Sequence, residues 1–201
     1  GLMAHQALEA SGILQVQRQP YLSLRGQGVL MGVVDTGIDY TQNTFRYEDG
    51  TSKIVSIFDQ TLPGTPPYEY LIGTEFTREQ INEALLSPNP LSVVPSTDTV
   101  GHGTFLASVA AGRQDGDFNG AAPDAELIVV KLKKARDYYL KKYLIPPEQE
   151  NAFESSAVML GIDYIIRKAQ QLGRPAAIII GVGTNLGGHA GFSPFEDFIE
   201  A

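Results

Sequence analysis

The segment VLMGVV, residues Val29–Val34, contains no polar side chain and runs directly into Asp35, Thr36 and Gly37. A β-strand that is covered on both faces has this composition, whereas a half-exposed strand alternates apolar and polar residues. Three other segments are similarly rich in Val, Ile and Leu: Ile54–Phe58, Glu126–Leu132 and Ala176–Val182. The four segments together predict a buried parallel sheet.

Helical patterns lie between and after these strands. Three helices are predicted over Arg78–Leu86, His102–Ala111 and Asn151–Leu172, and a fourth begins at Ser193. Thr77 provides a capping box for the first of them, and glycines end the second and third. Strands that alternate with helices predict an α/β fold, a doubly wound and mostly parallel sheet with helices on both faces.

The composition of the chain excludes several classes of function. The chain has 201 residues, 43% of them hydrophobic, which is enough for one domain with a real core. The net charge of −8 and the lack of a basic stripe argue against nucleic acid and against an anionic membrane as partners. The absence of cysteine excludes disulfides and thiol nucleophiles, and no apolar run approaches the ~20 residues of a membrane span. Lys131–Lys142 holds six Lys or Arg residues, which we interpret as a solvated helix face, with a partner site as the alternative.

Asp35 is the first candidate for chemistry. The carboxyl ends of strands are where sites collect in such a sheet, and Asp35 ends the first strand in a turn whose donors would keep its carboxylate ionised. The motif D-T-G alone leaves other interpretations open, because it recurs in aspartic proteases and in phosphoryl-transfer enzymes. Asp35 could also do no more than cap the turn.

His102 is the second candidate. It lies between Gly101 and Gly103 at the start of an apolar helix, where the glycines keep its imidazole accessible. The positive end of the helix dipole disfavours the protonated ring and favours the neutral form that a general base needs. A histidine that serves only packing is the alternative.

Both segments resemble motifs of the subtilisin-like serine protease (subtilase) family. VVDTGID at 33–39 resembles the aspartate motif, and GHGTFLASVAAG at 101–112 resembles the histidine motif, in the order of that family. IIIGVGTN at 178–185 is similar to the strand that forms one wall of the substrate pocket. FRYEDGTSKIVSIFDQT, EFTREQINEAL and GTNLGGHAG resemble the clostridial germination-protease (Csp-like) branch.

The resemblance implies roles for these residues. Asp35 would orient His102 and stabilise its charge, and His102 would take the proton of a catalytic serine. A peptide or protein substrate would lie along Gly181, Val182, Gly183 and Thr184. No cofactor and no metal is expected, because His5, His102 and His189 do not form a zinc set. Structural calcium occurs in some subtilases.

The sequence departs from the family at the nucleophile. The family places its serine in G-T-S-x-A at the head of a late helix, whereas the Gly50-Thr51-Ser52 of this chain leads into a strand and predicts a hairpin turn. Asn185 follows the pocket-wall strand, where a turn role is expected rather than that of the oxyanion asparagine. Residues 1–201 are therefore expected to be the N-terminal portion of a single subtilase catalytic domain, inactive alone, from a serine endopeptidase.

Two alternatives remain. One is a non-catalytic subtilase-like protein (pseudoprotease) that binds or regulates a partner. The other is a nucleotide- or phosphate-binding domain that uses the Asp35 turn, against which the absence of a G-x-G-x-x-G or P-loop motif argues. We also expect the chain to self-associate through the exposed edge of the strand Ala176–Val182. Its first residues lack the features of a signal peptide, and an extracellular or spore-associated bacterial location is compatible with the resemblance.

Overall fold

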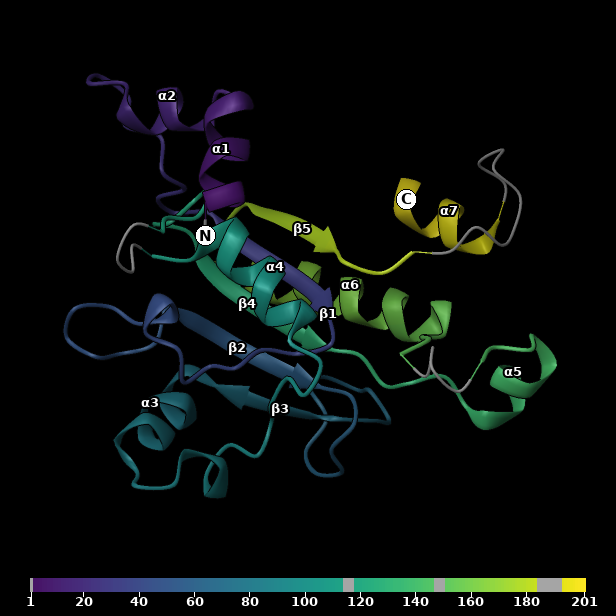
Figure 1. The fold of residues 1–201 in the computed structure, drawn as a ribbon. Helices are drawn as coiled ribbons and strands as arrows, with labels where there is room; N and C mark the ends of the chain where they lie inside the picture. Colours follow the sequence, from purple (N-terminus) through teal and green to yellow (C-terminus); the bar gives the residue numbers. More distant parts are fainter. Residues whose placement is uncertain (1, 114–117, 147–150, 184–192) are drawn as a thin grey trace.

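The computed structural model describes residues 2–113, 118–146, 151–183 and 193–201. A five-stranded sheet in the order β3-β2-β4-β1-β5 forms its centre (Figure 1). The strands are β1 (Leu30–Asp35), β2 (Ile54–Asp59), β3 (Thr74–Thr77), β4 (Glu126–Lys131) and β5 (Ala176–Ile180). All neighbouring pairs are parallel except β2 and β3. The α/β fold class is confirmed.

Seven α-helices are described: α1 (Leu2–Ala10), α2 (Ile13–Arg18), α3 (Arg78–Leu86), α4 (His102–Ala111), α5 (Asp137–Lys142), α6 (Ser155–Leu172) and α7 (Pro194–Glu200). The bounds of α3 and α4 agree with the sequence, as do the capping boxes at Thr77 and Ser193. The sequence placed the start of α6 too early, at Asn151. It also extended β5 to Val182, but the strand ends at Ile180.

Helices cover both faces of the sheet (Figure 1). On one face, side chains of α3 and α4 pack against Val33, Ile57 and Val129. On the other face, α6 packs against Val34 and Ile128. Two apolar layers therefore enclose the strands, which is why the strand sequences lack the alternation of a half-exposed sheet.

The strand β3 was missed by the sequence. It has only four residues, runs antiparallel to β2, and Phe76 is its one buried side chain. The hairpin turn that was expected at Gly50–Ser52 is present, since Tyr47 N donates to Thr51 O at 2.7 Å and a bridge joins Arg46 to Ser52. None of the described helices has the length and apolarity to span a bilayer.

The basic segment Lys131–Lys142 has two parts. Its second part, α5, buries no residue and projects from the sheet, as a solvated helix does (Figure 1). Lys131 behaves differently, because it ends β4 and its Nζ donates to Thr97 O at 2.6 Å and lies 3.8 Å from a carboxylate oxygen of Asp59. The interpretation as a solvated helix face therefore fits α5 but not Lys131.

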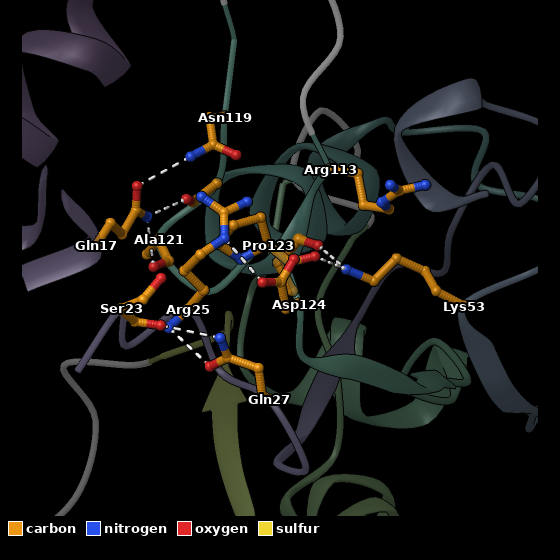
Figure 2. A network of polar contacts seen from close by, with 12 residues as sticks. Gln17, Ser23, Arg25, Gln27, Lys53, Arg113, Asn119, Ala121, Pro123 and Asp124 are labelled. Carbon is orange, nitrogen blue, oxygen red and sulfur yellow. Dashed lines mark hydrogen bonds and ion pairs between the residues drawn. The ribbon is translucent and has the colours of Figure 1, made fainter. Parts of the chain in front are cut away.

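The N-terminal helices α1 and α2 were not predicted from the sequence. Leu8 and Leu14 are their buried apolar residues, and Gln17 is a buried polar one. Gln17 Nε2 donates to the carbonyl oxygens of Gly120 and Ala121, both at 2.8 Å (Figure 2). These bonds attach α2 to the loop that precedes β4.

Candidate active site

Asp35 and His102 meet at the carboxyl end of β1. The Asp35 side chain is fully buried, whereas the His102 side chain is 49% exposed. His102 Nδ1 lies 2.9 Å from Asp35 Oδ1 and 3.0 Å from Oδ2. An ionised carboxylate only accepts hydrogen bonds, so we assign the proton of the neutral ring to Nδ1 and the free lone pair to Nε2.

The turn after Asp35 is tied to the start of α4. Thr36 N donates to Asp35 Oδ1 at 2.7 Å, and Gly103 N donates to Thr36 Oγ1 at 3.0 Å. A Cβ at residue 103 would lie 2.2 Å from Gly37 O, so only glycine allows the helix to approach this closely. Gly103, the second of the two glycines beside His102, is therefore required for packing.

Asp98 supports the same contact, a role the sequence did not reveal. Its Oδ1 accepts from Thr36 Oγ1 at 2.9 Å and from Gly101 N at 2.8 Å. Its Oδ2 accepts from Thr104 N at 2.9 Å and from Thr104 Oγ1 at 2.7 Å. Burial raises the pKa of Asp98, but the hydrogen bonds from Thr104, Gly101 and Thr36 outweigh it and leave the pKa below its ordinary value. An ionised Asp98 therefore joins the β1 turn to the first turn of α4.

Gly181 lies on the other side of Asp35. Gly181 N donates to Val34 O at 3.2 Å, which continues the pairing of β5 with β1. A Cβ at residue 181 would lie 1.8 Å from Asp35 Oδ2. Of the other residues expected to bind substrate, Val182 is partly buried and Gly183 is exposed. Thr184 lies outside the described residues, as do Asn185 and His189.

A groove of about 380 Å³ lies next to the turns that carry Asp35 and His102, although neither of these two residues lines it. Thr36, Thr99 and Val100 line it from the turns that carry Asp35 and His102. Lys131–Lys134, from the end of β4 onward, also line it, together with Thr61, Asn151 and Phe153. The groove therefore combines apolar surface with lysine side chains. Among the described residues, no three His, Cys, Asp or Glu side chains gather as a metal site would require.

This arrangement can carry out general base chemistry. Asp35 has no contact with bulk solvent, so its attraction to a protonated ring is screened less than at a surface. The exposed ring can receive a proton from a hydroxyl group through Nε2 and pass it on.

Comparison with known proteins gives one consistent result. The sequence model of the subtilase family (Peptidase_S8) matches residues 26–144. Two curated relatives from Arabidopsis thaliana, subtilisin-like proteases SBT2.2 and SBT2.1, are 29% and 31% identical over 126 and 125 residues, each match covering 53% of this chain. The solved structure of the Clostridium perfringens CspB protease matches 97% of this chain, with a TM-score of 0.80 and 31% identity. The chain spans 15% of the length of each curated relative and 37% of the CspB chain.

Proposed function

Because the chain belongs to the subtilase family, we propose that it supplies the aspartate and the histidine of a serine endopeptidase active site. The observation that carries this proposal is the 2.9 Å contact between the buried Asp35 carboxylate and Nδ1 of the half-exposed His102. The similarity to CspB over nearly the whole chain supports it. In this proposal, residues 1–201 are the N-terminal portion of one catalytic domain.

In the proposed mechanism His102 makes two proton transfers, both through Nε2. Nε2 of His102 takes the proton of the serine hydroxyl as the oxygen attacks the peptide carbonyl, and later gives it to the leaving amine. Asp35 keeps Nδ1 protonated and stabilises the imidazolium, but it does not take the proton itself. The sequence has no G-T-S-x-A motif, so the serine and the oxyanion asparagine come from another segment of the protein in this proposal.

The substrate is proposed to be an extended peptide. Among the described strands β5 pairs only with β1, so its outer edge is available for backbone hydrogen bonds, continuing along Gly181–Gly183. The groove at Thr36, Val100 and Phe153, next to the turns that carry Asp35 and His102, would receive side chains of the same peptide. No cofactor is needed for this chemistry.

A non-catalytic relative is the alternative, favoured by the missing serine motif. A protein without catalysis has no chemical need for a buried carboxylate paired with an exposed imidazole, which favours the protease. Labelling of the whole protein with a fluorophosphonate probe decides between the two. We expect stoichiometric labelling of wild type and of His5→Ala, which changes an exposed histidine, and strongly reduced labelling of His102→Ala. Equal labelling of His102→Ala, or none of wild type, would refute the proposed function.

A further inference from the structure

A second polar site lies at the opposite end of the sheet. Arg25 precedes β1, Arg46 and Tyr47 precede β2, Asp124 precedes β4, and Arg113 follows α4. These residues and Glu48 line a pocket of about 530 Å³, which we call the arginine pocket. It lies at the amino ends of the strands, whereas Asp35 and His102 lie at their carboxyl ends.

The described residues that line the arginine pocket include three arginines and two carboxylates. Asp124 is already paired with Arg25, since its Oδ2 lies 2.8 Å from Arg25 Nε. Glu48 lies 3.4 Å from Arg113, and its side chain is 93% exposed, so water screens this contact. Among the described residues, Arg46 makes no ion pair and the only ion pair of Arg113 is this screened one with Glu48.

A buried lysine adds to this charge. Lys53 Nζ donates to the carbonyl oxygens of Ala111 and Pro123 and points toward Asp124 (Figure 2). Burial lowers the pKa of Lys53 to about 8, although the charge of Asp124 raises it. Lys53 is thus still mostly protonated at pH 7, close behind the pocket.

The guanidinium groups are held in fixed positions. Arg113 Nη1 donates to Arg46 O at 3.1 Å, and the Arg113 guanidinium lies over the Tyr47 ring, 5.6 Å from its centroid. Tyr47 Oη is fixed in turn by Glu126 at 3.2 Å. Arg46 Nη2 donates to Thr41 O at 2.5 Å. The donors of the pocket are therefore oriented before any ligand arrives, which lowers the cost of binding.

One of these donors has no acceptor. Arg46 Nε is buried and makes no hydrogen bond within the described parts of the chain. A buried N–H group without an acceptor is unfavourable, and such groups call for an explanation such as a bound ion or water. The group belongs to a residue that lines the arginine pocket, but the Nε atom itself is buried, so an acceptor in the pocket would reach it only after a shift of the Arg46 side chain.

We propose that the arginine pocket binds a small phosphate-bearing molecule. The planar guanidinium group offers donors in the geometry that phosphate oxygens accept, and Arg46 and Arg113 would share the anion between them. A volume of about 530 Å³ falls within the range of small-molecule sites and leaves room for more than the phosphate group.

Inorganic phosphate and pyrophosphate serve as probes for the whole protein. We expect both to raise the unfolding temperature and to bind saturably in calorimetry at constant ionic strength, with chloride as the control anion. Pyrophosphate, which places two phosphate groups in the pocket, should bind more tightly. Failure of both anions to bind saturably would refute the site.

Variants then locate the binding. Arg46→Gln and Arg113→Gln are each expected to weaken phosphate binding about tenfold or more, because each removes a charged donor. Arg136→Gln is the matched control, since Arg136 is exposed and pairs with Glu154 away from the pocket. Arg113→Gln keeps the measurement interpretable if Arg46→Gln does not fold. Unchanged affinity in a folded Arg113→Gln variant would overturn the proposal, and none of these results depends on peptidase activity.

Discussion

A methyl group on Gly181 would lie 1.8 Å from Oδ2 of Asp35, so the end of β5 and the buried carboxylate are in direct contact. The sequence assigned Gly181 to the substrate. The structure adds a second constraint, because any side chain here must displace the carboxylate that faces His102 or move the strand end.

Gly181→Ala is therefore expected to destabilise the fold by about 1–3 kcal/mol, as overpacking in a core does. In the whole protein we expect kcat to fall about 100-fold or more, because small displacements of catalytic groups are costly. Gly183→Ala is the matched control for stability, since a Cβ at residue 183 would have no atom of the described residues within 4 Å. Chemical denaturation of both variants measures the difference, and equal stabilities would contradict the contact.

Asp35→Asn and His102→Ala test the proposed proton transfer. Asn at residue 35 preserves the shape but favours the wrong ring tautomer, and we expect kcat to fall about 10⁴-fold, as it does in other Asp-His-Ser triads. Peptide hydrolysis by the whole protein gives this number. A loss of less than tenfold in Asp35→Asn would show that His102 does not depend on Asp35. The isolated 201-residue chain is expected to show no hydrolysis.

Asp98→Asn tests a positioning residue. It weakens the attachment of Thr36 to Gly101 and Thr104, so we expect kcat to fall about 10- to 100-fold while KM changes little. Glu83→Gln, at an exposed carboxylate on α3 outside the groove, is the control and should keep kcat near wild type. A change in KM alone would assign Asp98 to substrate binding instead.

Asp98→Asn is also expected to change how the stability of the fold depends on pH in the acidic range. The pKa of Asp98 is lower in the folded than in the unfolded protein, where it is about 3.9. The stability that its ionised form contributes is therefore present above about pH 4 and is lost as the pH falls through the folded value. Urea unfolding at pH 6 and pH 3 should show a larger loss for wild type than for Asp98→Asn. Parallel losses would mean that Asp98 titrates as it does in the unfolded chain.

Lys53 predicts a pH dependence of the same sign in the basic range. Its pKa falls from 10.5 in the unfolded chain to about 8 in the folded protein, because burial penalises the charge. Between these values the unfolded state binds more protons, so the contribution of Lys53 to stability rises with pH. Relative to Lys53→Met, wild type should gain about 2 kcal/mol between pH 8 and pH 10. Lys133→Met, at an exposed lysine, should show no such gain over this range.

The open edge of β5 predicts self-association of the 201-residue chain. Ile178, Ile179 and Ile180 are only partly buried, and an exposed strand edge is a template for pairing with a second copy. Light scattering at micromolar concentration should detect dimers or larger species. Ala177→Lys places a charge on this strand and should restore the monomer, whereas Gln170→Lys on α6 should not. A monomeric wild-type chain would argue against edge pairing.

The sequence identified the residues whose signals are local. Asp35 and His102 each lie in a motif of a few residues, and the strands beside them are marked by apolar runs. The structure brings together two side chains that are 67 positions apart in the sequence, as the motif order had suggested.

Other features could not be predicted from the sequence, because they are contacts between segments that lie far apart in the chain. Asp98 and Thr36 are 62 positions apart, and neither the hydrogen bond between them nor the contact of Gly181 with Asp35 leaves a pattern in the sequence. The arginine pocket draws its residues from four separate segments. The strand β3 was missed because four residues with one buried side chain show too little periodicity.

The two hydrogen bonds of Gln17 have a consequence for the order of folding. They join α2 to Gly120 and Ala121, which lie 103 and 104 positions further along the chain. During synthesis, α2 therefore cannot make these contacts until Gly120 and Ala121 have been added, which is after more than half of these 201 residues. Contacts of such long range also slow folding, because a large loop must close before they form.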